Sequence, residues 1–119
     1  MQIKLFDSEL KVMEALWKEG DLTAGQLAKI LEKETNWNRN TTYTVIKKCI
    51  EKGAIERFEP NFMCRAMISK EEVRELEIME LVCKLFDGSA EMFFASFLNG
   101  KRLTKEQIDK LKQIVHELE

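Results

Sequence analysis

The chain has 119 residues, of which 45% are hydrophobic and 34% are charged. This length allows one full globular core without disulfides, whereas a second core would need a partner. The three cysteines stand at wide spacings, which excludes a disulfide-stabilised secreted scaffold and a zinc site of the C-x-x-C type. We find neither a signal-peptide pattern nor a stretch of membrane-spanning length, so we expect a cytoplasmic protein without direct membrane binding.

The net charge is only −2, but the charge is unevenly distributed along the chain. Residues 1–70 contain 12 Lys/Arg against 10 Asp/Glu, whereas residues 71–119 contain 7 against 11. A nucleic-acid surface needs local positive charge rather than a basic total, so the first part is the candidate for binding. The acidic run from Glu71 to Glu80 predicts a solvated face that keeps the second part off DNA.

A first helix is predicted near the N-terminus. Apolar residues recur at helical spacing from Phe6 to Trp17. Asp7 or Ser8 is the expected N-cap, and Gly20 is the expected terminator because it lacks a Cβ.

Two further helices follow closely. Thr23 and Gln26 form a capping-box pattern ahead of a helix that ends near Thr35. Asn38 is the expected cap of a third helix, which runs to Gly53. The connections between these helices are short, as in a helix-turn-helix.

A β-hairpin is predicted after the third helix. Two short extended runs, Ala54–Phe58 and Phe62–Ile68, flank the turn residues Glu59-Pro60-Asn61. Three helices followed by a hairpin within about 70 residues is the order of a winged helix-turn-helix, whose third helix reads DNA.

Three more helices are predicted downstream. The first runs from Ser69 to Phe86, and Asp87-Gly88-Ser89 separates it from the apolar stretch Ala90–Leu98. A capping-box pattern of Thr104 and Gln107 opens the last helix.

The predicted protein is therefore mainly α. We expect a winged-helix DNA-binding domain at residues 1–69, with three helices and a hairpin wing, and a three-helix dimerisation domain at residues 70–119.

The third helix carries two interleaved stripes. One stripe is expected to face the core and consists of Thr42, Val45, Ile46 and Cys49. The other offers amide, phenol, hydroxyl and ammonium groups to base edges and phosphates. The predicted DNA contacts of this helix are Arg39, Asn40, Thr41, Tyr43, Thr44, Lys47, Lys48 and Lys52.

The N-terminal turns of a recognition helix enter the major groove deepest, so the early residues are the expected base readers and the lysines are the expected phosphate contacts. On the hairpin, Arg57 and Arg65 are the expected phosphate contacts, because the turn between them is not basic. An ordinary solvated helix face is the alternative explanation of the polar stripe.

The segment from Trp37 to Gly53, WNRNTTYTVIKKCIEKG, resembles the signature helix of the penicillinase-repressor (BlaI/MecI/CopY) family. The resemblance extends from Glu9 to Leu85–Ser89 and Leu103–Leu111. It implies a dimeric transcriptional repressor whose winged helices bind an inverted-repeat operator and whose C-terminal helices intertwine. It also implies that the chain has no catalytic activity.

The downstream helices carry more apolar residues than one small chain can bury, so we expect a second copy to cover them. The predicted dimerisation residues are Leu76, Met79, Val82, Phe86, Phe93, Phe94, Phe97, Leu111 and Val115. In the resembling family a membrane sensor with a metalloprotease domain triggers cleavage in this segment. The matching bond is Ser96-Phe97, where the family's Asn-Phe is Ser-Phe.

Two functions from different classes remain: a transcriptional repressor, and a winged-helix module that binds proteins and not DNA. The polar and basic stripe between Arg39 and Lys52 favours the repressor. An enzyme is not expected, because no serine lies in a G-x-S-x-G setting and His116 is the only histidine. We expect no cofactor and no structural metal, and the cysteines are predicted to be core thiols.

Overall fold

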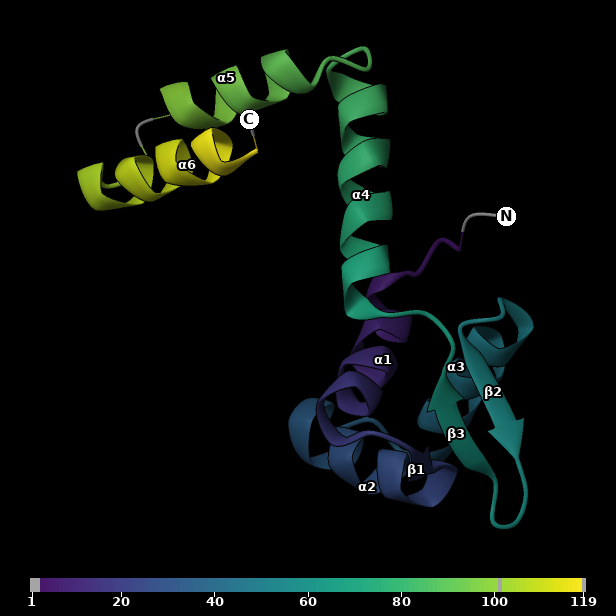
Figure 1. The fold of residues 1–119 in the computed structure, drawn as a ribbon. Helices are drawn as coiled ribbons and strands as arrows, with labels where there is room; N and C mark the ends of the chain where they lie inside the picture. Colours follow the sequence, from purple (N-terminus) through teal and green to yellow (C-terminus); the bar gives the residue numbers. More distant parts are fainter. Residues whose placement is uncertain (1–2, 101, 119) are drawn as a thin grey trace. The chain divides into compact units, whose positions relative to one another are not determined.

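The computed structural model describes residues 3–100 and 102–118, which form six helices and three short strands (Figure 1). In chain order they are α1 (Asp7–Glu19), β1 (Leu22–Thr23), α2 (Ala24–Thr35), α3 (Arg39–Glu51), β2 (Ile55–Phe58), β3 (Met63–Ala66), α4 (Lys70–Leu85), α5 (Ala90–Asn99) and α6 (Lys105–Glu117). The predicted mainly α fold, with three helices, a hairpin and three further helices, is confirmed. Within the described ranges, no helix is long and apolar enough to cross a membrane.

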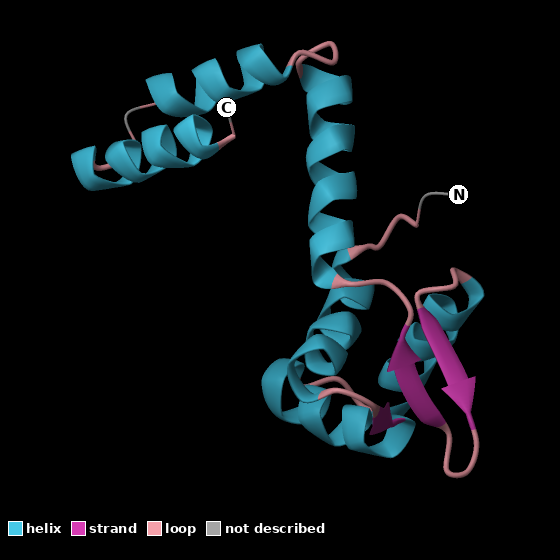
Figure 2. Ribbon diagram, in the orientation of Figure 1, coloured by secondary structure: helices cyan, strands magenta, loops and turns pink. Residues whose placement is uncertain are grey.

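The hairpin belongs to a three-stranded antiparallel sheet in the order β1-β3-β2, drawn in magenta in Figure 2. The sequence did not predict β1, because two residues are too few to show strand periodicity. Leu22 of β1 and Arg57 of β2 lie opposite Cys64 of β3 from its two sides. The wing is therefore tied to the segment that leads into α2.

The predicted caps of α2 and α3 are confirmed. The Thr23 hydroxyl accepts a hydrogen bond from the Gln26 N–H at 3.1 Å, and the Gln26 side chain accepts one from the Thr23 N–H at 2.9 Å. The Asn38 side chain accepts a hydrogen bond from the Thr41 N–H at 2.8 Å. These bonds satisfy N–H groups that have no partner within their helix, and so set where each helix begins.

The predicted cap of α1 is wrong. Neither Asp7 nor Ser8 is the N-cap, because the helix already begins at Asp7 and Phe6 occupies the cap position. Phe6 has no side-chain acceptor, and the first turn is instead closed by Glu9, whose carboxylate accepts the Phe6 N–H at 2.8 Å. Glu9 is buried beside the first turn of α1, where its carboxylate takes the place of a capping side chain. The local sequence pattern does not show that Glu9 is buried.

One hydrophobic core holds the winged-helix unit together. Its largest fully buried apolar side chains come from α1, α2, α3 and β3, and they are Val12, Met13, Leu27, Leu31, Ile46, Cys49 and Cys64. Burial of an aliphatic side chain of this size contributes about 1.5 to 3 kcal/mol, so this cluster is the main source of stability. The Trp17 indole N–H also donates to the Ile68 carbonyl at 2.9 Å, which fixes the chain just before α4.

The winged-helix unit extends further than the boundary expected at residue 69. Val73 is buried and Leu76 packs against the core, so the compact unit ends at Leu76 and the second unit begins at Glu77. The first two turns of α4 belong to the winged-helix core. Leu76, which we predicted as a dimerisation residue, thus has a packing role within its own chain.

Two of the three cysteines are core thiols, as predicted. Cys49 and Cys64 are fully buried, and burial raises the pKa of the Cys49 thiol to about 12 and that of Cys64 to about 11. For Cys49, the nearby Glu9 carboxylate raises the pKa further. The prediction is wrong for Cys83, which is exposed on α4 in the single chain.

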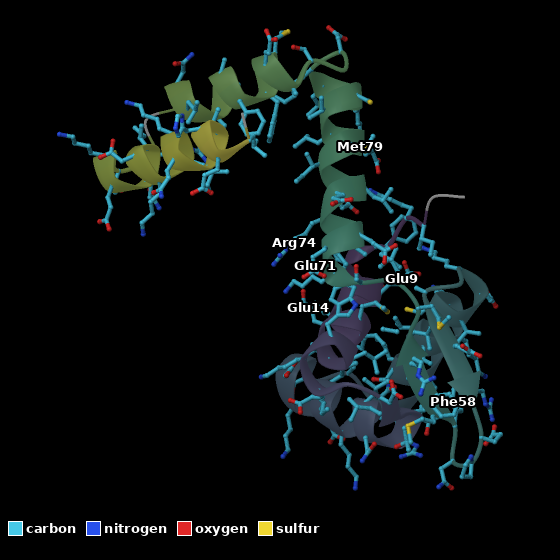
Figure 3. The ribbon with its side chains drawn as sticks, viewed as in Figure 1. Glu9, Glu14, Phe58, Glu71, Arg74 and Met79 are labelled. Atoms are coloured by element: carbon cyan, nitrogen blue, oxygen red, sulfur yellow. The ribbon has the colours of Figure 1, made fainter. Side chains whose placement is uncertain are left out.

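A buried ion pair joins the end of α3 to the start of α1. The Lys52 ammonium lies 2.6 Å from the Glu9 carboxylate and 2.7 Å from the Lys4 carbonyl, and it stands 4.0 Å from the centre of the Phe6 ring. The Glu9 side chain is 1% exposed and that of Lys52 is 28% exposed. Figure 3 shows Glu9 among the side chains of this unit. A carboxylate buried to this degree needs a cationic partner.

We predict that Lys52→Met lowers the free energy of unfolding by about 2 to 3 kcal/mol, because it leaves the Glu9 carboxylate buried without its cation. Urea denaturation measures this change. The matched control is Lys48→Met, which removes the same charge from an exposed position one turn earlier and should change stability by less than about 0.5 kcal/mol. Equal stability of the two variants would contradict a structural role for the ion pair.

Candidate nucleic-acid interface

The helix α3 has one buried face and one exposed face, as predicted. Its buried residues are Thr42, Val45, Ile46 and Cys49. Because the buried residues recur every three or four positions, the remaining positions project away from the core. The residues that the structure leaves exposed on α3 are Arg39, Asn40, Thr41, Thr44, Lys47, Lys48 and, at the C-terminal end, Glu51.

Tyr43 lies at the edge between the two faces. The Arg39 guanidinium donates a hydrogen bond to the Tyr43 hydroxyl at 2.9 Å and stands 5.0 Å from the ring centre. The ring itself meets Phe62 of the wing edge-on, with the two centres 5.8 Å apart. Both contacts restrict the rotamers of Arg39 and Tyr43, so these side chains are ordered on one surface before any ligand binds.

Thr44 offers a methyl group and an acceptor oxygen to a ligand. Its hydroxyl donates to the Asn40 carbonyl at 2.9 Å, one turn back along α3. This bond uses the only proton of the hydroxyl and leaves its lone pairs available. The neighbouring Asn40 side chain is exposed, and so are Lys47 and Lys48 one turn further along the helix.

Both arginines of the wing are already paired within the chain. Arg57 lies 2.9 Å from the Glu59 carboxylate and stacks 3.7 Å from the centre of the Phe62 ring. Arg65 lies 2.9 Å from Asp21 and 4.7 Å from the centre of the Phe58 ring. Figure 3 labels Phe58 on β2. The Asp21 hydrogen bonds raise the pKa of Arg65 above its ordinary value.

Sequence reasoning missed the acidic and aromatic partners of these arginines. Glu59 and Phe62 lie in or beside the turn, and Asp21 lies 44 residues away from Arg65 in the chain. A local sequence pattern could not predict the ion pair between Arg65 and Asp21, because the two residues are brought together by the pairing of β1 with β3. The sequence motif Arg-Phe-Glu at 57–59 is the only signal that could have suggested the Arg57–Glu59 pair.

The structure gives Lys52 a role different from the predicted phosphate contact. Its ammonium is held by Glu9 and the Lys4 carbonyl, on the part of the unit where α1 begins. An ammonium that makes a buried ion pair would have to leave its partner in order to reach a phosphate, and that exchange is costly. The exposed lysines of α3 are therefore Lys47 and Lys48.

The second unit exposes the apolar residues of α5 and α6. Among the described residues of these two helices, none is buried. A groove of about 710 Å³ lies between them and is lined by Phe94, Phe97, Leu98, Ile108, Leu111 and Val115 together with a few polar residues. Phe86 and Phe93 pack edge to face across the break between α4 and α5, with ring centres 5.5 Å apart.

The remaining predicted dimerisation residues are also incompletely covered by their own chain. Met79 on α4, labelled in Figure 3, is 58% exposed, and Val115 on α6 is 59% exposed. Val82 is half-buried. Side chains of this size and exposure are unusual on a chain that acts alone. The predicted cleavage bond Ser96-Phe97 lies within α5, with both residues exposed.

The described residues contain no group of three or more His, Cys, Asp or Glu that could hold a metal ion. Among the described elements, Cys49 lies on α3, Cys64 on β3, Cys83 on α4 and His116 on α6.

Comparison with known families decides the classification. The profile of the family described as "Penicillinase repressor" matches residues 5–117. The chain belongs to the penicillinase-repressor family. This family consists of transcriptional regulators and not of enzymes, and the resemblance of the signature helix is thereby confirmed.

Relatives of the penicillinase-repressor family match over nearly their whole length. The penicillinase repressor of Bacillus licheniformis is 26% identical over 116 residues, covering 96% of this chain and 91% of the relative. The methicillin resistance regulatory protein MecI of Mammaliicoccus sciuri is 19% identical, covering 95% of this chain and 94% of the relative.

Solved structures of this family match the winged-helix part. The DNA-binding domain of the repressor BlaI superposes with a TM-score of 0.55 at 26% identity, covering 59% of this chain and 88% of that domain. The monomeric form of Bacillus licheniformis BlaI in complex with the blaP half-operator superposes with a TM-score of 0.54 at 27% identity, covering 60% of this chain and 90% of that one.

Proposed function

We propose that this chain is a transcriptional repressor that binds an inverted-repeat operator as a homodimer. The observation that carries the proposal is the exposed face of α3, where Arg39, Tyr43 and Thr44 are held in place while the opposite face is locked in the core. The related BlaI in complex with a half-operator supports the proposal, because this chain has the same fold over that region.

The proposed contacts divide into two groups. The base-reading residues are Arg39, Asn40, Thr41, Tyr43 and Thr44, because they occupy the first turns of α3. The phosphate contacts are Lys47, Lys48, Arg57 and Arg65. We leave Lys52 out of the phosphate group, because its ammonium is engaged by Glu9.

The proposed operator-binding form is a dimer joined through residues from Glu77 onward. The observation in its favour is that α5 and α6 bury none of their described side chains, while an apolar groove runs between them. A second copy would cover these surfaces and would place two recognition helices about 34 Å apart, one turn of duplex DNA. In this proposal the winged-helix unit, which ends at Leu76, binds DNA, and the unit from Glu77 onward dimerises.

A protein-interaction module without DNA binding is the second candidate, since any amphipathic helix has a polar face. The two candidates are distinguished by titration with duplex DNA at about 50 and 200 mM salt, because phosphate contacts make affinity fall steeply with salt. A repressor loses affinity by orders of magnitude between these conditions. A module that binds only proteins shows no DNA binding at either salt concentration.

We predict that Tyr43→Ala and Thr44→Ala each lower discrimination between operator and random DNA by about 1 to 3 kcal/mol, because each removes a group placed to meet a base edge. The operator is first identified by sequencing the DNA that the protein retains from a random pool. Lys48→Ala is the control, since loss of a phosphate contact weakens binding to all DNA alike. Equal losses on operator and random DNA for the Tyr43 and Thr44 variants would remove them from the base-reading group.

We predict that Val115→Glu converts the dimer to a monomer, because it places a charge on the apolar groove between α5 and α6. Sedimentation or light scattering measures the mass in solution. The matched control is Gln113→Glu, which adds the same charge at an exposed position on α6 outside the groove lining and should leave the dimer intact. A dimeric Val115→Glu protein would show that the interface lies elsewhere.

We further propose that the repressor acts in the cytoplasm and is inactivated there through a sensor metalloprotease of the membrane, by cleavage of the Ser96-Phe97 bond. The bond lies within the helix α5, so α5 must open locally before it can enter a protease site. Cleavage would remove α6 and one wall of the apolar groove. By mass action, loss of the dimer would then free the operator.

We predict that a chain ending at Ser96 is monomeric and binds its operator at least tenfold more weakly than the intact protein, because it lacks α6 and with it one wall of the apolar groove. Mass in solution and operator affinity are measured together. A truncated chain that stays dimeric and binds with unchanged affinity would refute both the interface and this route of induction.

A further inference from the structure

An aromatic and cationic ladder connects the recognition helix to the wing. It begins with Arg39, which bonds to the Tyr43 hydroxyl at 2.9 Å, and continues through the edge-on contact of Tyr43 with Phe62. It ends with Arg57, whose guanidinium lies 3.7 Å from the centre of the Phe62 ring. Two guanidinium groups, one on α3 and one on β2, are thus positioned by the same pair of aromatic rings.

Phe62 is the central residue of this ladder and contacts both Tyr43 and Arg57. Its backbone has a φ of 52°, a left-handed conformation that is rare for a bulky residue and costs about 1 kcal/mol. Three contacts hold it there besides the Tyr43 ring. Its carbonyl accepts the Ala24 N–H at 2.9 Å, its N–H donates to Glu59 at 3.3 Å, and its ring supports Arg57.

Arg57 lies on the side of the hairpin that faces α3. Its position in β2 is opposite the buried Cys64 of β3, whereas Arg65 is opposite the exposed Glu56. Side chains alternate between the two faces of a strand, so the two wing arginines occupy opposite faces. Arg57 is therefore the wing arginine that shares a surface with Tyr43 and Arg39.

The Glu59 carboxylate neutralises Arg57 on this surface. One of its oxygens lies 3.0 Å from the Arg57 Nε and 2.9 Å from a terminal nitrogen, and the other accepts the Phe62 N–H. The Phe62 N–H, followed by Arg57, lowers the pKa of Glu59 below its ordinary value, so the group is ionised at neutral pH. A carboxylate and a phosphate offer the same kind of acceptor to a guanidinium.

We propose that Glu59 is a built-in competitor for DNA: its carboxylate occupies the place on Arg57 that a backbone phosphate takes in the complex. Binding then proceeds by exchange of the carboxylate for the phosphate, while the Phe62 ring keeps the guanidinium in position. The pair is exposed, with side chains 48% and 63% accessible, so it is weak enough to exchange. This inference rests on the proposed DNA-binding function.

The test uses the full-length chain and a random-sequence duplex of about 30 base pairs, titrated at several salt concentrations. Glu59→Gln keeps an oxygen for the Phe62 N–H and removes only the charge. We expect it to bind DNA about two- to fivefold more tightly than the unaltered chain, the size of one exposed ion pair. The matched control is Glu56→Gln, which removes the same charge from β2, just before the turn, on the face opposite to that of Arg57.

A double-mutant cycle with Arg57→Ala separates the exchange from general repulsion between Glu59 and DNA. Arg57→Ala should weaken binding and reduce the slope of log affinity against log salt by about one. In the Arg57→Ala background, Glu59→Gln should increase affinity no more than Glu56→Gln does. Urea denaturation of each variant verifies that the fold is retained.

The outcomes distinguish this inference from the proposed function. Salt-dependent binding by the unaltered chain, together with equal gains for Glu59→Gln and Glu56→Gln, would overturn the exchange and leave the repressor function standing. A Glu59→Gln gain that persists in the Arg57→Ala background would overturn it as well. Absence of any salt-dependent DNA binding by the unaltered chain would overturn the proposed function, and the exchange with it.

Discussion

The placement of α3 depends on the buried ion pair between Glu9 and Lys52. Glu9 closes the first turn of α1 through the Phe6 N–H, and its carboxylate also binds the ammonium at the end of α3. One side chain thus links the first turn of α1 to the residue that follows α3. A buried carboxylate with a single cation tolerates few alternative packings, because every alternative leaves a charge without compensation. The orientation of the exposed face of α3 follows from this ion pair together with the buried residues Val45, Ile46 and Cys49.

The wing is oriented by a different kind of contact. Phe62 stands between α3 and Arg57, and its carbonyl binds the N–H of the first residue of α2. Its unfavourable backbone conformation persists because these contacts outweigh it. The recognition helix and the wing therefore form one continuous surface, whose positive charge is partly offset by Glu59 and Asp21. Net charge alone does not reveal such a surface, because the chain as a whole carries −2.

The second unit differs from the winged-helix unit in how little apolar surface it buries. The winged-helix unit buries Met13, Leu27 and Ile46 completely, whereas the described residues of α5 and α6 bury nothing completely. A unit of this size has too little area to remove the apolar side chains of α5 and α6 from water. In the proposed dimer, the stability of this part would be coupled to association, and a signal that disturbs the association would also act on the DNA-binding form. Such regulation by mass action would need no conformational change within the winged helix.

The sequence by itself determined the order of the helices, the caps at Thr23 and Asn38, and the division of α3 into two faces. These features depend on local hydrogen bonds and helical periodicity, which neighbouring residues specify. Only the tertiary structure decided that Lys52 pairs with the buried Glu9, that Asp21 pairs with Arg65, and that Leu76 belongs to the first core. These contacts join residues far apart in the chain, so their geometry exists only once the helices and strands have packed. The sequence shows which residues are basic, whereas the packing of the chain decides which basic side chains are free to meet a ligand at the surface.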